Sequence, residues 1–130
     1  GHHQHKHTAY RRQRQMCIRD RRSYVQKVID ESLGQPGLTP VSLATRLNIS
    51  VRHLYRLFEE QGDSVCRYIQ RARLQRSADD LANPIHKTES ITTIAYKWGF
   101  TDSAHFSRSF KKQYEQSPKD FRSTSLASLA

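Results

Sequence analysis

The feature that most constrains the fold of this 130-residue chain is a pattern that occurs twice along it. The stretches LATRLNISVRHLYRLF (43–58) and IAYKWGFTDSAHFSRSF (94–110) each carry apolar residues at helical spacing on both sides of a central break. They align through the pairs Ala44 and Ala95, Asn48 and Gly99, Leu54 and Phe106, Arg56 and Arg108, and Phe58 and Phe110. We therefore expect the chain to build the same small helical unit twice.

The break in each stretch falls at a residue that suits a sharp turn. Asn48 and Gly99 stand between two short apolar segments, and a tight turn there needs a left-handed backbone conformation. Glycine adopts that conformation freely, and asparagine tolerates it better than most residues. Two short helices joined in this way form a helix-turn-helix unit, whose protruding second helix fits a DNA major groove.

Apolar spacing and capping residues predict an all-α fold over residues 23–122. A first helix begins at Ser23 and closes before Gly34, and a longer connector helix runs from Ser64 to about Ala82. The last helix is expected to end at Arg122. Each short helix is preceded by a residue that can cap its N-terminus, namely Thr39, Ser50, Ser90, Asp102 and Ser117. No segment requires a strand.

The two ends of the chain lack such periodicity. Residues 1–22 are rich in His and carry seven Lys or Arg and one Asp, and we interpret them as a flexible basic tail, typical of an added or artefactual end. The natural protein is then expected to continue upstream, and residues 123–130 form a flexible C-terminal tail. Removing 1–22 lowers the net charge from +10 to +4, since 15 basic and 11 acidic residues remain. This mildly basic balance favours a nucleic-acid partner.

Several function classes are excluded by what the sequence lacks. No apolar run approaches the roughly 18 residues that cross a membrane, so we expect a cytoplasmic protein without membrane contact. Cys17 and Cys66 suit neither a disulfide framework nor a zinc site, and Cys66 is expected to be buried. His53 and His105 lack a third ligand at metal spacing. The sequence contains no catalytic pair and no phosphate-binding loop, so it indicates neither an enzyme nor a bound cofactor.

The segment AYKWGFTDSAHFSRSFKKQYEQSPKDFR (95–122) closely resembles the signature of the AraC/XylS family of bacterial transcription regulators. The shared residues are Ala95, Gly99-Phe100, Asp102, His105-Phe106, Arg108, Phe110-Lys111, Ser117-Pro118 and Phe121-Arg122. The resemblance covers residues 23–122 and implies seven helices, with two helix-turn-helix units joined by the long connector. One departure is Glu115, which stands where the signature usually has the glycine that ends the second recognition helix.

The resemblance implies sequence-specific binding of double-stranded DNA for transcriptional regulation, chiefly activation, with RNA polymerase as a further partner. Two recognition helices would enter successive major-groove segments, and an N-terminal effector-sensing domain would be missing from this chain. Arginine reads guanine or holds phosphate, and short polar side chains reach either. By position, the first helix presents Arg52, Tyr55 and Arg56, and the second presents Ser103, Ala104, His105, Ser107 and Arg108.

Some alternatives stay open at this point. A small stand-alone regulator without a sensor domain and a helical module that binds no DNA fit the same pattern, whereas a methyl-accepting repair protein would need a cysteine cluster. Trp98 and Phe100 are expected in the core rather than stacked on bases. Glu59 and Glu60 follow the first recognition helix and must point away from DNA if it enters its groove deeply. Connector arginines either contact phosphate or form a solvated face: Arg67, Arg71, Arg73 and Arg76.

Overall fold

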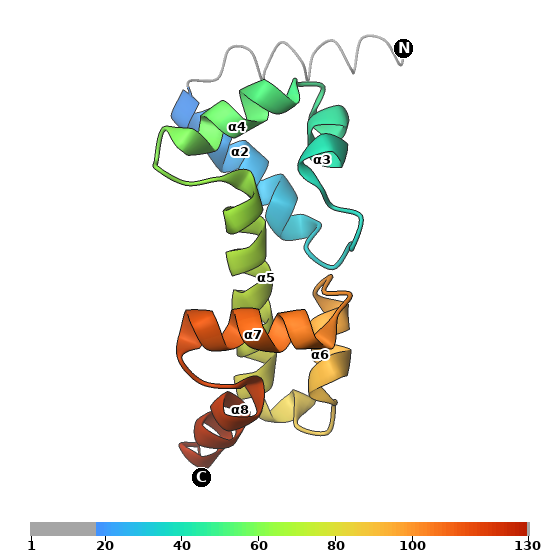
Figure 1. Ribbon diagram of the computed structural model, residues 1–130, viewed down its shortest axis with the longest axis vertical. Coiled ribbons are helices and arrows are strands. Elements are labelled where there is room, and N and C mark those ends of the chain that lie inside the picture. Colours follow the sequence, from blue (N-terminus) through green and yellow to red (C-terminus); the bar gives the residue numbers. More distant parts are fainter. Residues whose placement is uncertain (1–17, 130) are drawn as a thin grey trace. The chain divides into compact units, whose positions relative to one another are not determined.

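The computed structural model describes residues 18–129, which form seven α-helices, one short 3-10 helix and no strand. In chain order these are α2 (Ile18–Glu31), α3 (Pro40–Leu47), α4 (Val51–Glu59), α5 (Val65–Ala82), η1 (Pro84–His86), α6 (Ile91–Lys97), α7 (Ser103–Tyr114) and α8 (Pro118–Ala127) (Figure 1). The prediction of an all-α, seven-helix fold with a long connector, α5, is confirmed. None of the described helices is long and apolar enough to span a bilayer.

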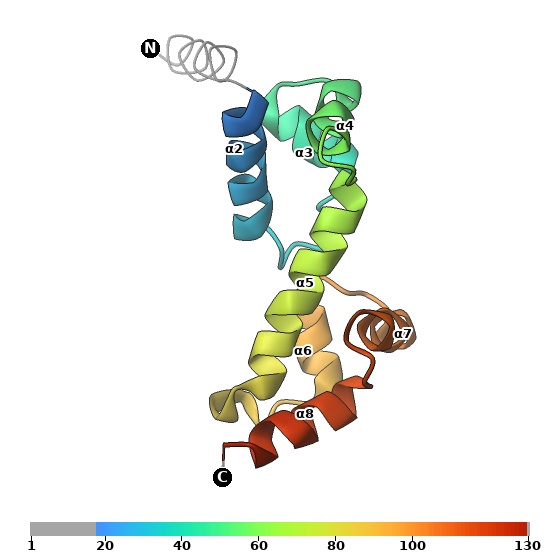
Figure 2. The ribbon, with the colours of Figure 1, turned by 90° about the vertical axis from the view of Figure 1, so that its left-hand side faces the viewer.

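The described chain divides into two compact units, and each contains one helix-turn-helix pair. The first unit comprises residues 18–32 and 38–68, and in it both α2 and α3 pack against α4. The second comprises residues 33–37 and 69–129, where α7 contacts both α6 and α8. Within the second unit, Figure 2 shows α7 end-on at the side of α5 and above α8. The repeat in the sequence thus corresponds to a repeat in the fold.

Each unit has its own apolar core. In the first, Leu54 and Phe58 of α4 are fully buried, together with Val25, Ile29, Leu43 and Val65. In the second, Phe106 and Phe110 lie one turn apart on α7 and are also fully buried. The ring of Phe100 packs 4.9 Å from that of Phe106, and Trp98 is half-buried against the same cluster. The assignment of both aromatic residues to the core is confirmed.

The first helix begins earlier than the sequence predicts. Helix α2 starts at Ile18, so residues 18–22 belong to the fold and the tail boundary at residue 22 is wrong. Arg22 is only 8% exposed, and its Nε donates a hydrogen bond of 2.8 Å to the Leu57 carbonyl. Leu57 lies in the last turn of α4, where carbonyl groups have no partner within the helix. Arg22 supplies that partner, which sequence spacing could not reveal. Residues 1–17 lie outside the described part.

Replacing Arg22 with alanine is therefore expected to destabilise the protein by about 1.5 to 3 kcal/mol, because a charged hydrogen bond is lost and a shielded carbonyl loses its partner. Chemical denaturation monitored by circular dichroism measures the change. Lys27→Ala removes the same charge from an exposed site on the same helix and serves as the control. Equal stability of the two variants would show that Arg22 belongs to the tail after all.

The last helix extends beyond its predicted end. Helix α8 continues to Ala127, so the prediction of a flexible tail over 123–130 is wrong for residues 123–127. The serine- and threonine-rich run after Arg122 has weak helix propensity but contains neither Pro nor Gly to stop a helix. Leu126 in the added turn is half-buried, so this turn removes some apolar surface from water.

Cys66 is exposed, contrary to the expectation that it is buried. It follows Val65, which is fully buried, in the first turn of α5. Neighbouring residues on a helix point about 100° apart, so a buried residue commonly has an exposed neighbour. The hydrophobic character of a cysteine is therefore a poor guide to its side of the helix.

The helix ends follow the residues that the sequence marks. All five predicted capping residues accept a hydrogen bond from a backbone N–H in the first turn of their helix. Asn48 and Gly99 have φ values of 58° and 92°, so both predicted turns are left-handed. Gly62 (φ 70°) and Glu115 (φ 62°) adopt the same region beyond α4 and at the end of α7. Glu115 is therefore a side-chain-bearing residue at a position that favours glycine.

Glu115→Gly is expected to stabilise the protein by about 0.5 to 1 kcal/mol. It relieves the left-handed strain and removes a negative charge from the negative end of the α7 dipole, and greater freedom of the unfolded chain offsets part of the gain. Gly62→Ala is the opposite change at φ 70° and should destabilise, although its added Cβ would meet nothing within 4 Å. Denaturation midpoints of both variants test this. A lower midpoint for Glu115→Gly would show that Glu115 is not strained.

Candidate nucleic-acid interface

Helix α4 has one buried side and one exposed side. Leu54, Leu57 and Phe58 are buried, and Ser50 caps the helix by accepting a 3.0 Å hydrogen bond from the His53 N–H. The three predicted contact residues, Arg52, Tyr55 and Arg56, are exposed and share the lining of one surface hollow with Val51 and Glu59. Helix α4 therefore presents two guanidinium groups and a phenol together.

Helix α7 is arranged in the same way. Phe106 and Phe110 are buried, and the Asp102 carboxylate accepts hydrogen bonds from the N–H groups of Ala104 and His105 at 2.9 and 3.3 Å. All five predicted contact residues of this helix are exposed: Ser103, Ala104, His105, Ser107 and Arg108. The same side of the helix continues with Lys111, which is also exposed. Donors and small side chains thus lie on the solvent side.

The turn between α6 and α7 lies close to an arginine of α5 and to the loop after α2. Arg73 donates hydrogen bonds to the carbonyls of Leu33 (Nε, 3.1 Å) and Gln35 (Nη2, 2.7 Å). A Cβ on Gly99 would come within 2.8 Å of the Arg73 guanidinium and 2.6 Å of the Leu33 carbonyl oxygen. Gly99 is therefore required both by its backbone conformation and by the close approach of these groups. Arg73 therefore has a structural role, which is neither of the two roles, phosphate contact or a solvated face, that the sequence left open for the connector arginines.

A family model described as a helix-turn-helix domain matches residues 43–124, a span that includes both helix-turn-helix pairs. The HTH-type transcriptional activators RhaS of Citrobacter koseri and Klebsiella pneumoniae are 40% and 38% identical over 82 and 81 residues, which is 62% of this chain. The chain belongs to the AraC/XylS helix-turn-helix family. The matched part spans 28% of the length of each of these two relatives.

Solved structures of similar fold agree with this AraC-type assignment. The C-terminal domain of the response regulator AraT from Geobacillus stearothermophilus is 30% identical, with a TM-score of 0.66 over 79% of this chain and 84% of that one. The C-terminal domain of the response regulator yesN from Fusobacterium nucleatum is 27% identical, with a TM-score of 0.69 over 77% and 95%. Both superpose on far more than a single helix pair.

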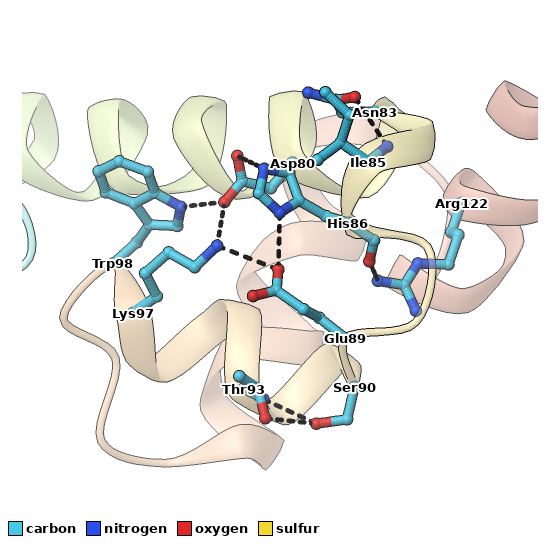
Figure 3. Close-up of polar contacts among 10 residues, drawn as sticks. All are labelled: Asp80, Asn83, Ile85, His86, Glu89, Ser90, Thr93, Lys97, Trp98 and Arg122. Atoms are coloured by element: carbon cyan, nitrogen blue, oxygen red, sulfur yellow. Dashed lines mark hydrogen bonds and ion pairs between the residues drawn. The ribbon is translucent and has the colours of Figure 1, made fainter.

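In this AraC-type domain a polar network holds α6, the first helix of the second pair, on α5 (Figure 3). Asp80 Oδ2 accepts hydrogen bonds from Trp98 Nε1 at 2.8 Å and from Lys97 Nζ at 3.0 Å. Lys97 Nζ also donates to Glu89 Oε2 at 3.1 Å, and that oxygen lies 2.9 Å from His86 Nδ1. Glu89 precedes α6 and Lys97 ends it, so the network holds both ends of the helix.

The network favours the charged forms of Asp80 and Lys97. Burial alone would raise the pKa of Asp80, but the hydrogen bonds from Trp98 and Lys97, aided by the charges of Lys97 and His86, lower it overall. Burial works against the charge of Lys97, while its bonds to Asp80 and Glu89 raise its pKa. A carboxyl group whose pKa is lowered by folding stabilises the protein at pH values above its pKa in the unfolded chain. This stabilisation is lost as the pH falls through the lower pKa of the folded state. The support of α6 should therefore weaken in acid.

The electrostatics of α4 are mixed. Partial burial, followed by the charges of Arg21 and Arg56, lowers the pKa of His53, so this side chain is neutral near pH 7. Glu60 lies 3.7 Å from Arg22, which engages it in the first unit. Glu59 instead lines the hollow with Arg52 and Arg56. The sequence left open whether the two acidic residues point away from the recognition side, and Glu59 lies on the side that carries the predicted contact residues.

The remaining connector arginines differ in their surroundings. Arg67 Nε donates to Ser64 Oγ at 3.3 Å, and the Arg76 guanidinium lies 5.8 Å from the centre of the Trp98 ring. Sequence reasoning missed Arg22, Arg73 and Asp80 as supports of this AraC-type domain, because their partners are 17 to 40 residues away in the chain. Within residues 18–129, no three His, Cys, Asp or Glu side chains gather as a metal site would require.

Proposed function

We propose that this chain binds specific sequences of double-stranded DNA and thereby regulates transcription, as an activator. The observation that carries the proposal is the repeated division of α4 and α7 into a buried apolar side and an exposed side that bears every predicted contact residue. The activator role is supported by the RhaS relatives, which are described as transcriptional activators.

In the proposed complex, α4 and α7 enter successive major-groove segments. Arg56 and Arg108 occupy matching positions and bind guanine edges or phosphates, while Arg52, Tyr55, Ser103, His105 and Ser107 contact neighbouring bases or backbone. Ala104 offers only an apolar contact, suited to a thymine methyl group. Two helices that read successive segments of one duplex must lie roughly 34 Å apart along it, so the protected region covers about two helical turns.

Membership of the family supports two further proposals. We propose that the chain contacts RNA polymerase when it activates transcription, and that an effector-sensing domain precedes the helix-turn-helix part in the natural protein. We place its action in the bacterial cytoplasm, where the chromosome lies. The eight contact residues are proposed to act in DNA recognition alone, with no part in catalysis, cofactor binding or metal binding.

The test is selection of bound duplexes from a pool with about 25 randomised base pairs. The chain should enrich a defined sequence and bind it roughly 1,000-fold or more tightly than a scrambled duplex at physiological salt. Its affinity should also fall steeply as salt rises, because phosphate contacts release counterions. A helical module that binds only proteins would enrich no sequence, and that result would overturn the proposal.

A further inference from the structure

A fourth exposed side chain continues the row of contact residues on α4. Arg52, Tyr55, Arg56 and Glu59 follow the spacing i, i+3, i+4 and i+7, which places them on one side of a helix, and all four line the same hollow. Homeodomain recognition helices read the major groove with four residues at this spacing. By position, Glu59 therefore belongs to the recognition side of α4, although it is acidic.

The Glu59 carboxylate takes part in none of the ion pairs among the described residues, whereas Glu60, the next residue, lies near Arg22. A carboxylate close to DNA is repelled by the phosphates and loses hydration in the groove, unless a donor on the DNA compensates. The matching residue on α7 is Lys111, so the charge at this position is reversed between the two helices.

The major groove offers two kinds of base donor, the exocyclic amines of cytosine and adenine. The adenine amine lies beside the N7 acceptor of the same base, which repels a carboxylate. The cytosine amine has no acceptor on its own ring edge in the major groove, and glutamate is suited to accept from it. Cytosine is thus the base that matches Glu59.

We propose that Glu59 is a specificity-determining residue that accepts a hydrogen bond from the amine of one cytosine in the segment read by α4. This inference rests on the proposed function, because it assigns a base to a helix already placed in the groove. It also means that α4 and α7 read unlike sequences, since Lys111 donates where Glu59 accepts.

The experiment compares duplexes selected from the randomised pool by the parent chain and by Glu59→Gln. The parent should enrich cytosine at one position of one segment, and changing that C·G pair to T·A should weaken binding roughly 5- to 150-fold. Glu59→Gln should enrich adenine there, because a glutamine amide pairs with adenine N6 and N7, and every other position should keep its preference. Glu59→Ala should lose the preference without gaining another.

Glu31→Gln is the matched control, because it removes a carboxylate from an exposed site at the end of α2 and should select the same sequences as the parent. Circular dichroism confirms that each variant is folded. If Glu59→Gln and Glu59→Ala select the parent sequences and merely bind all duplexes more tightly, Glu59 only repels phosphate and the inference is overturned while the proposed function stands. If the parent enriches no sequence, the proposed function fails and the inference fails with it.

Discussion

Replacing Gly99 with alanine is expected to lower the free energy of unfolding by about 2 to 5 kcal/mol, because backbone strain and a steric clash act together at this position. The φ angle of 92° is strained for a residue with a side chain, at a cost of about 1 to 2 kcal/mol. The new Cβ would also lie 2.6 Å from the Leu33 carbonyl oxygen and 2.8 Å from the Arg73 guanidinium, and such overpacking costs about 1 to 3 kcal/mol.

Urea denaturation of Gly99→Ala against the parent measures the loss. Gly37→Ala is the control, because a Cβ there would meet nothing within 4 Å and φ lies outside the left-handed region. That control should be neutral or stabilising by up to about 1 kcal/mol. If Gly99→Ala were as stable as Gly37→Ala, the turn between α6 and α7 would have to be loose enough to yield, contrary to the contacts described.

Replacing Arg56 or Arg108 with alanine is expected to weaken binding to the selected duplex by about 1 to 3 kcal/mol each if, as proposed, each guanidinium bonds a base edge in its own segment. Both side chains are exposed, so neither change should lower stability appreciably. Titration of labelled duplex measures the affinity, and Lys119→Ala on α8 controls for the loss of one positive charge.

The comparison of selected and scrambled duplexes separates the two roles that an arginine has on DNA. A loss confined to the selected sequence indicates base reading, whereas a uniform loss across all duplexes would make the residue a phosphate contact. If neither substitution altered binding, the assignment of α4 and α7 as recognition helices would be contradicted.

The parts of the fold that could be predicted are those determined locally. Few residues other than Asn and Gly adopt a left-handed turn easily, which identifies Asn48 and Gly99. A serine or aspartate at the start of a helix caps it by accepting a hydrogen bond from an N–H group only two or three residues later. Apolar spacing likewise identifies the buried sides of α4 and α7, and thereby the exposed sides.

The parts that could not be predicted depend on residues distant in sequence. In the sequence Arg22 resembles one more charge in a basic tail, and only the carbonyl of Leu57, 35 positions later, shows that it belongs to the fold. Arg73 and Asp80 are similar cases, since their partners come from the loop after α2 and from α6. The predictions for Cys66 and for residues 123–127 are wrong because neither carries a strong local signal.

The residues of the candidate site could be predicted from the sequence, but the bases that they contact could not. All eight predicted contact residues are exposed on α4 and α7. Their positions between the apolar residues of the repeat predicted this exposure. Glu59 is a poor candidate in the sequence because an acidic side chain suits phosphate poorly and because we expected the helix to end before it. In the structure α4 includes Glu59, which therefore lines the same hollow as Arg52 and Arg56. Which base each residue contacts depends on the DNA and stays a prediction.

The most direct test of paired recognition by α4 and α7 is binding to the selected duplex after insertion of half a helical turn, about five base pairs, between its two enriched segments. The insertion rotates one segment away from its recognition helix, so we expect binding to weaken by more than about tenfold, with protection confined to one segment. Unchanged affinity with both segments still protected would contradict paired recognition, since α4 and α7 would then not read successive segments of one duplex together.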